Sequence, residues 1–186
     1  MKKFILTDET IEMFGVTLHR IKAVRSFGNV KEGDLGGFVE KEENISEHFE
    51  AWVYSNAKVS GNAKVSGNAE VSGNAKVWGN AKVSGNAKVW GNAKVSGNAK
   101  VSGNAEVSGN AKVSGNADYI VFKNWWSSCR YFTWTRSNNM WSVGCFYGTG
   151  EELIKKAYQD SEKSGREYER VVKYVQSILE EDHEDN

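Results

Sequence analysis

Two residue types that often carry chemistry are scarce in this chain. Among 186 residues there are only two cysteines, Cys129 and Cys145, and three histidines, His19, His48 and His183. Two cysteines cannot build a disulfide scaffold, so we expect a cytoplasmic protein whose thiols stay reduced and lie in the core, with a Cys129–Cys145 disulfide as the alternative. No Cys/His pair has the spacing of a zinc site, and we therefore expect no metal and no cofactor.

Long apolar runs and an excess of one charge are also missing. No run approaches the roughly 20 apolar residues that cross a bilayer. The opening MKKFILTDETIEMF has no small-residue cleavage site, so we expect neither a membrane span nor a signal peptide. The 24 basic and 24 acidic residues balance. Because no region is strongly basic, the counterion release that drives nucleic-acid binding is weak, and we do not expect a nucleic-acid partner.

What the chain has instead is a six-residue repeat. Residues 53–118 are eleven near-copies (hexads) of Val-Ser-Gly-Asn-Ala-Lys without a gap. If Ala and Val point inward along a short strand, Lys and Ser point outward, while Gly and Asn tolerate the positive φ of a sharp corner. A Gly-Asn pair in all but the first of the hexads excludes a helix, and a flat array would leave exposed edges. The pattern predicts a parallel β-solenoid with a coil of twelve residues (two walls) or eighteen (three walls).

The repeat also resembles a known family. The phrase Val-x-Gly-Asn-Ala-x over residues 53–118 is similar to the hexapeptide repeat of left-handed parallel β-helices. That resemblance implies a left-handed, triangular solenoid with three hexads, or eighteen residues, in each coil. The segments MKKFILTDETIEMFGVTLHRIKAVRSFGNVKEGDLGGFVE and SNNMWSVGCFYGTGEELIKKAYQDSEKSGREYE look like parts of uncharacterised phage and prophage proteins that carry such repeats. The resemblance therefore implies a phage-type protein of unestablished biochemical role.

We expect a mainly β protein in three parts. Residues 1–46 form an N-terminal β cap, residues 47–118 a hexapeptide-repeat β-helix of about four coils, and residues 119–186 a C-terminal hairpin with a helical cap. Two caps are needed because a bare end coil exposes its apolar core and its strand edges.

The segments that flank the repeat predict the elements of these caps. KFIL, MFGVTLHRIKAV and GGFVE predict short strands in the N-terminal cap. Beyond the repeat, an aromatic-rich stretch predicts a hairpin that turns at residues 137–139. Capping boxes at residues 149–152 and 164–167 predict two helices. The second helix places its apolar residues on one face: Tyr168, Val171, Val172, Val175, Ile178 and Leu179.

An eighteen-residue coil sorts the outward residues onto three walls. Wall one carries Lys58, Lys76, Lys94 and Lys112, wall two carries Trp52, Glu70, Lys88 and Glu106, and wall three carries Lys64, Lys82, Lys100 and Asp118. Tyr54 and Trp90 also fall on wall two, and Trp78 on wall one, at positions where other hexads have serine. We interpret the lysine rows of walls one and three as a solvated surface, with an anion site as the alternative.

The aromatic and alternating charged residues predict a docking surface. It consists of Trp52, Tyr54, Trp78, Trp90, Glu70, Lys88 and Glu106. Large aromatic rings at outward positions need a cover, which is either the chain's own terminal segments or a partner protein or second copy.

The function expected from these residues is binding. Hexapeptide β-helices are best known as acyltransferases in which a coil histidine acts as general base between the subunits of a trimer. The eleven hexads contain no histidine, and only His48 could approach a coil surface. We assign no catalytic residue and predict a homo-oligomeric, non-catalytic interaction or scaffold protein of phage type that engages or inhibits a host factor. The alternative is a trimeric acyltransferase-like enzyme.

Overall fold

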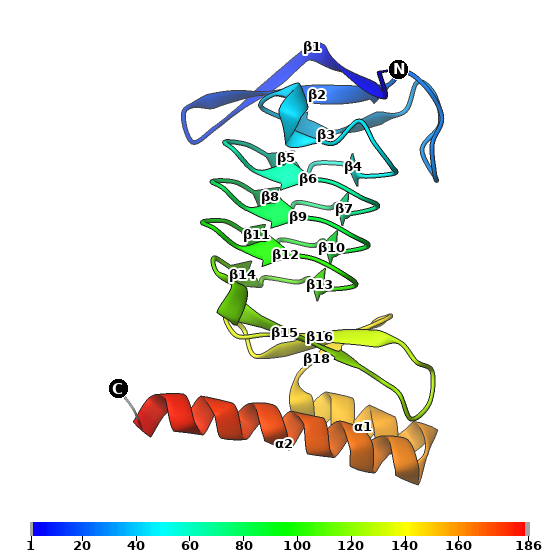
Figure 1. Ribbon diagram of the computed structural model, residues 1–186, viewed down its shortest axis with the longest axis vertical. Helices are drawn as coiled ribbons and strands as arrows, with labels where there is room; N and C mark the ends of the chain where they lie inside the picture. The colour runs from blue at the N-terminus through cyan, green and yellow to red at the C-terminus, as the bar shows by residue number, and fades with distance from the viewer. Residues whose placement is uncertain (1, 185–186) are drawn as a thin grey trace.

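The protein is an elongated stack of β-coils closed by a different cap at each end (Figure 1). The computed structural model describes residues 2–184. An N-terminal cap lies at one end of the long axis, and a C-terminal sheet followed by two helices lies at the other (Figure 1). The predicted mainly β fold, a parallel solenoid between two caps, is confirmed.

The repeat forms eleven strands of two residues each, in which one outward residue precedes a core valine. They are β4 (Trp52–Val53), β5 (Lys58–Val59), β6 (Lys64–Val65), β7 (Glu70–Val71), β8 (Lys76–Val77), β9 (Lys82–Val83), β10 (Lys88–Val89), β11 (Lys94–Val95), β12 (Lys100–Val101), β13 (Glu106–Val107) and β14 (Lys112–Val113). Strands β4 to β11 each pair in parallel with the strand three hexads further on, as Lys58 pairs with Lys76. This register confirms the eighteen-residue coil with three walls and excludes the two-walled alternative.

The solenoid core contains two small residue types in strict alternation. Apart from Ala117, which is exposed where the repeat ends, the alanine and the valine of every hexad are fully buried, as Ala75 and Val77 show. The corners need glycine because φ is positive there and the next coil is close. A Cβ added to Gly85 (φ 69°) would lie 2.9 Å from the backbone nitrogen of Gly103. The asparagine after each glycine extends a ladder along the corner, as Asn62 Nδ2 donates to Asn80 Oδ1 (3.3 Å).

The N-terminal cap is an antiparallel hairpin joined to wall one. Strands β1 (Phe4–Met13) and β2 (Val16–Ala23) pair with each other, and β3 (Leu35–Val39) pairs antiparallel with β2 and parallel with β5. The prediction of one strand over MFGVTLHRIKAV is wrong, because Phe14 (φ 54°) and Gly15 (φ 78°) turn the chain inside that segment.

Side chains of this cap satisfy the backbone carbonyls at the first coil. After β3, the short 3-10 helix η1 (Glu42–Asn44) presents Asn44, whose Nδ2 donates to Ala63 O (2.8 Å). Lys3 is fully buried and its Nζ donates to Ala51 O (2.8 Å). Burial lowers the pKa of Lys3 to about 8.

At the opposite end of the solenoid the backbone N–H groups of the last coil have no further coil to pair with, and side-chain oxygens accept their hydrogen bonds instead. Lys100 N–H donates to Asn116 Oδ1 (2.9 Å), Glu106 N–H to Thr133 Oγ1 (2.9 Å) and Lys112 N–H to Ser137 Oγ (2.7 Å). Asp118 does not extend wall three as predicted. It lies in the 3-10 helix η2 (Asn116–Asp118), where its carboxylate accepts the Gly115 N–H (2.9 Å) and ends the repeat.

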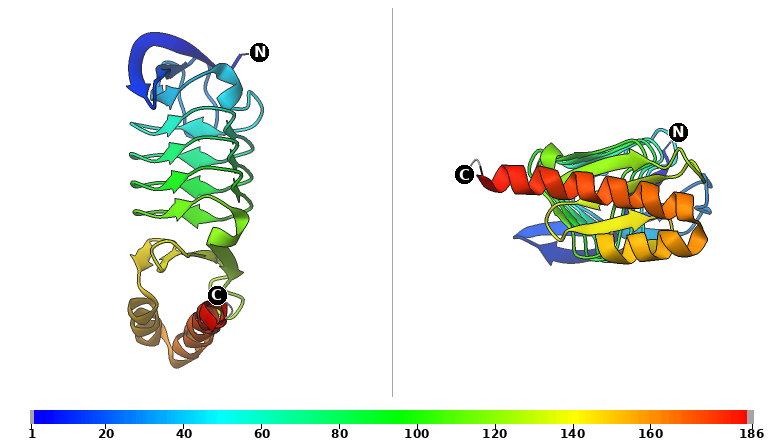
Figure 2. Two further views of the ribbon diagram at one scale, coloured as in Figure 1. Left: turned by 90° about the vertical axis from the view of Figure 1, so that its left-hand side faces the viewer. Right: turned by 90° about the horizontal axis from the view of Figure 1, so that it is seen from below.

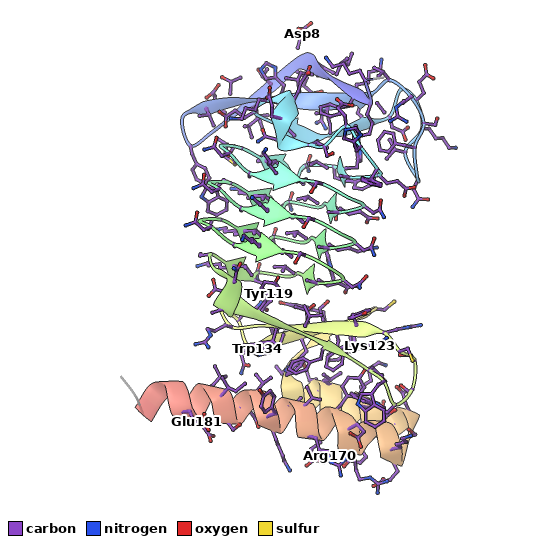
Figure 3. The ribbon with its side chains drawn as sticks, in the orientation of Figure 1. Asp8, Tyr119, Lys123, Trp134, Arg170 and Glu181 are labelled. Carbon is purple, nitrogen blue, oxygen red and sulfur yellow. The ribbon has the colours of Figure 1, made fainter. Side chains whose placement is uncertain are left out.

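The C-terminal cap is a four-stranded antiparallel sheet under which two helices lie (Figure 2). The strands are β15 (Tyr119–Lys123), β16 (Tyr131–Thr135), β17 (Met140–Val143) and β18 (Phe146–Gly148), and the helices are α1 (Gly150–Asp160) and α2 (Glu162–Glu184). The predicted hairpin is β16–β17, and β15 and β18 flank it. Side chains fill the layer between sheet and helices, where Trp134 lies (Figure 3).

The sequence predicted the start of α1 correctly but not the start of α2. At α1 the box is confirmed, since Thr149 Oγ1 accepts the Glu152 N–H (3.2 Å) and Glu152 accepts the Thr149 N–H (2.8 Å). The box expected at residues 164–167 is wrong. Helix α2 begins at Glu162, and Ser161 Oγ accepts the Ser164 N–H (3.1 Å).

The two cysteines lie at the surface of the C-terminal cap. Cys129 and Cys145 are free thiols, and both are exposed, so their predicted place in the core is wrong. The physical reason is that each lies in a connection rather than a strand, between β15 and β16 and between β17 and β18.

Candidate functional site

The first aromatic of wall two is part of the core. Trp52 is 1% exposed and contacts two rings of the N-terminal cap. Its ring centroid lies 6.0 Å from that of Phe4 and 5.3 Å from that of Phe27, both edge to face. Trp52 therefore cannot take part in binding while the N-terminal cap is in place.

Tyr54 is partly buried against the same core. Burial raises the pKa of its phenol, and the carboxylates of Glu70 and Glu50 raise it further. The hydroxyl is therefore protonated at neutral pH and can donate a hydrogen bond.

Trp78 lies on wall one and meets the tip of the β1–β2 hairpin. The ring of Phe14 is 5.7 Å from that of Trp78, and Lys76 Nζ lies 5.7 Å from the Phe14 ring centroid. Phe14 itself is 69% exposed. The contact covers Trp78 only in part and leaves an apolar ring open to solvent beside a lysine row.

Trp90 meets the C-terminal cap. Its ring lies 6.4 Å from that of Tyr147 in an edge-to-face arrangement, and the Tyr147 hydroxyl accepts a hydrogen bond from Asn138 Nδ2 (3.0 Å). The four predicted aromatic residues are thus brought to three places, and each of Trp52, Trp78 and Trp90 contacts a ring from a cap.

The charged residues of wall two are paired within the chain. Lys88 Nζ lies 3.6 Å from a Glu70 carboxylate oxygen, and the Glu106 carboxylate accepts the Ser142 hydroxyl hydrogen (3.1 Å). On wall two, Lys88 is thus paired with Glu70, Glu106 is hydrogen-bonded to the C-terminal cap, and a cap contacts the wall at each end.

Walls one and three present the open charged surface. Their outward lysines stack in register: Lys58, Lys76, Lys94 and Lys112 on wall one, and Lys64, Lys82 and Lys100 on wall three. No ion pair within residues 2–184 joins any of these seven ammonium groups to a carboxylate. Burial and the Lys76 charge lower the pKa of Lys58. We name these seven residues the basic face.

The two rows of the basic face flank one corner of the coil. The chain passes from wall one to wall three through the asparagine ladder, in which Asn62 Nδ2 donates to Asn80 Oδ1 and Asn80 Nδ2 to Asn98 Oδ1 (3.3 Å each). Lys41 Nζ extends this edge into the N-terminal cap, 3.5 Å from Asn62 Oδ1. The sequence contains the signal for this face, because lysine precedes the core valine in every strand of walls one and three, although the sequence pattern alone favoured a solvated surface.

The three histidines lie in different segments of the chain. His19 lies in β2, where its Nδ1 is 3.2 Å from Thr7 O, and His48 is exposed between η1 and β4. His183 lies near the end of α2. In the described part of the chain, no group of three or more His, Cys, Asp or Glu side chains could hold a metal ion.

Comparisons with known proteins leave the family open. No protein-family model matches the chain, and no curated protein matches it either. Within residues 2–184, no helix is both long enough and apolar enough to cross a membrane.

Proposed function

We propose that this chain is a non-catalytic binding or scaffold protein whose basic face docks an acidic surface of another protein. The observation that carries the proposal is the absence, within residues 2–184, of ion pairs to the seven stacked lysines on walls one and three, beside wall two, where the charges are paired.

Electrostatics favour such a partner. Successive lysines of a row stand about 4.8 Å apart, and like charges in register oppose each other by a few tenths of a kcal/mol per pair. A carboxylate-rich surface relieves that repulsion and steers the encounter. The rows are held by a fully buried Ala/Val core, so docking orders side chains but not backbone.

The exposed Phe14 ring gives the face an apolar element. It lies between Lys76 and Trp78 at one side of wall one. Aromatic rings bordered by charge are the residues that most often anchor protein interfaces. The partner we propose therefore carries carboxylates along one side and an apolar contact for Phe14.

The resemblance to phage and prophage hexapeptide proteins supports a bacterial cytoplasm as the location that we propose for this binding, and a host factor as the partner that we propose. Self-association into a homo-oligomer is a separate possibility that concerns wall two. There, Glu70 and Lys88 alternate, so two copies could meet with complementary charge. Sedimentation of the purified protein measures this directly.

Charge reversal on wall three tests the proposal. Lys82→Glu with Lys100→Glu changes two exposed, register-paired residues of the basic face. Lys155→Glu with Lys163→Glu makes the same change of net charge on the exposed helices. The partner is first captured from the natural host by the wild-type protein and then purified. Its affinity is measured for all three proteins at low and high salt.

We expect the wall-three variant to bind at least about tenfold more weakly, the helix variant to bind as the wild type does, and the wild-type affinity to fall with salt. Equal weakening by both variants, or an affinity independent of salt, contradicts the proposal. Saturable binding of acyl-coenzyme A that is lost in His48→Ala favours the acyltransferase-like alternative instead.

A further inference from the structure

A cavity of about 330 Å³ lies in the C-terminal cap, between the sheet and the two helices. It belongs to a part of the molecule that the basic face does not include. Figure 2 shows the elements that surround it, with α1 and α2 set below the four-stranded sheet. Its volume falls at the lower end of the range for small-molecule sites, about 300–1,000 Å³.

One part of the cavity lining is apolar. The side chains come from the sheet and from α1: Val143, Phe146, Leu153 and Ala157. Leu153 and Ala157 are each 3% exposed and belong to the aromatic core of the cap. This part of the lining suits a small aliphatic or aromatic group.

A second part of the lining is polar, buried and held in place. Asn124 is 2% exposed, and its Nδ2 donates to the Tyr168 hydroxyl oxygen (3.0 Å) and to Ser127 Oγ (2.8 Å). Its Oδ1 accepts the Ser127 N–H (2.9 Å). These bonds fix the position of the Tyr168 hydroxyl.

Two buried hydroxyls keep a free donor. Tyr168 is 7% exposed and its oxygen accepts from Asn124, so its own hydrogen remains available. Burial raises the pKa of Tyr168, which keeps that hydrogen in place at neutral pH. Ser164 is 6% exposed and lines the same cavity, where its hydroxyl can donate a hydrogen bond.

The exposed rim of the cavity carries more positive than negative charge. Arg130 and Lys156 contribute two cations, and Asp160 contributes one carboxylate that opposes an anion. The Cys145 thiol also lies on the rim and is accessible.

We propose that this cavity binds a small amphipathic anion, a carboxylate or phosphate ester with a compact apolar body. The apolar body packs on Leu153 and Ala157, and the Ser164 and Tyr168 hydroxyls donate to the anionic oxygens. Arg130 draws the anion to the rim. Charged acceptors make stronger hydrogen bonds with buried hydroxyls than neutral ones do.

The probes are phenylacetate, octanoate and phenyl phosphate, with the uncharged phenylacetamide and octanamide as matched controls. Each is titrated into the full-length protein and followed by ligand-observed NMR. In a Cys129→Ser background, a thiol reagent labels Cys145 alone, and the labelling rate reports occupancy of the rim. We expect saturable binding of at least one anion, slower labelling of Cys145 in its presence, and binding of the matching amide at least tenfold weaker.

Three variants locate the site. Ser164→Ala and Tyr168→Phe each remove one hydroxyl, and Ser177→Ala removes a hydroxyl from the exposed side of the same helix. We expect about a tenfold loss of affinity for each of the first two and no change for the third. Thermal unfolding of each variant checks that the cap is intact. The absence of saturable binding for all three anions, equal binding of the amides, or unchanged affinity in both folded cavity variants would overturn the proposal.

Discussion

The solenoid and the C-terminal cap bury their cores by opposite means. In the solenoid the repeating core positions from Ala51 to Val113 are alternately alanine and valine, and all of them are fully buried. In the cap a few large aromatic rings pack against one another, and none of these contacts is repeated elsewhere in the chain. Trp126 packs edge to face on Tyr168 (5.1 Å between centroids), and Phe132 lies 6.0 Å from Trp141.

The difference teaches where a change is tolerated. Each coil packs against nearly identical coils above and below. An outward residue can therefore vary as long as alanine and valine keep their inward positions. A ring in the cap packs against residues that have no equivalent elsewhere in the chain. Loss of that ring therefore leaves a cavity that no neighbouring unit can fill. Substitutions at five places in the molecule test this contrast. The largest effect is expected in the core of the solenoid and the smallest at the contact between the two regions.

The largest effect is expected at the centre of the solenoid. Val77→Asp places an unpaired charge where the native side chain is fully buried, and should lower the free energy of unfolding by more than about 4 kcal/mol. The same aspartate at Ser84, an outward position, should change it by less than about 0.5 kcal/mol. Urea unfolding followed by circular dichroism measures both. Equal tolerance of the two aspartates would contradict the inward and outward assignment.

The aromatic core of the cap should be almost as sensitive. Trp141 is 2% exposed and lies 5.8 Å from the Phe122 ring, so Trp141→Ala leaves a large cavity and should cost about 3–5 kcal/mol. Trp125 is 69% exposed, and Trp125→Ala should be close to neutral. Thermal unfolding compares the two. Similar losses from both substitutions would show that the cap core does not stabilise the protein.

Lys3 connects the N-terminal cap to the first coil and should make stability depend on pH. Its pKa is lowered from 10.5 to about 8 by burial. Between these values the unfolded chain binds more protons than the folded one, so this group raises the free energy of unfolding as pH increases through that window. Lys3→Met should remove this slope and, by leaving the Ala51 carbonyl without its donor, cost about 1–3 kcal/mol at pH 7.

The matched control is Lys2→Met, which removes an exposed ammonium paired with Glu42. Urea unfolding at several pH values between about 7 and 10.5 separates the two effects. Parallel pH curves for the wild type and Lys3→Met would show that the Lys3 ammonium does not titrate in the folded protein.

Two equivalent glycines separate conformational strain from crowding. Gly85 (φ 69°) faces the next coil, where an added Cβ would lie 2.9 Å from Gly103 N, whereas a Cβ at Gly103 (φ 67°) meets nothing within 4 Å. Gly103→Ala should therefore cost about 1 kcal/mol for its left-handed backbone alone. Gly85→Ala should cost roughly 2 kcal/mol more, because the adjacent coil must move. Thermal unfolding of both variants tests the difference, and equal costs would show that the coils separate readily.

The sequence predicted the solenoid well because the same residue type returns at the same position of each hexad. The positions of Ala, Val, Gly and Asn within the hexad indicated which residues face inward. The residues alone were compatible with two coil lengths, and the resemblance to hexapeptide β-helices favoured eighteen residues. In the N-terminal cap the same reasoning missed the hairpin turn, since Phe14 adopts a left-handed backbone that sequence patterns assign to glycine.

The structure of the non-repeating C-terminal cap was predicted less well, because it depends on individual tertiary contacts that no sequence pattern reveals. Helix α2 begins beside Ser161, not at the more typical box that follows Ser164, and one residue separates it from α1. This tight connection holds Gly165 against the Tyr158 ring, where a Cβ would be 2.2 Å from a ring carbon. For the candidate site, the repeat phase identified the unusual aromatics, but the rings that meet them, Phe14 and Tyr147, come from non-repeating segments.

The smallest effect is expected at Trp90, where the two regions meet. Its ring is half-buried and pairs edge to face with Tyr147 at 6.4 Å. Trp90→Ser restores the repeat consensus, so the coil should keep its circular dichroism spectrum, while loss of an aromatic pair should lower the free energy of unfolding by about 1 kcal/mol. A double-mutant cycle with Tyr147→Ala isolates that pairwise energy. Sedimentation tests the other possible cover: a smaller mass for Trp90→Ser would mean that the ring also contacts a second copy. If neither stability nor mass changes, Trp90 is idle in the free protein, and only an external partner on wall two could explain why tryptophan stands where most hexads have serine.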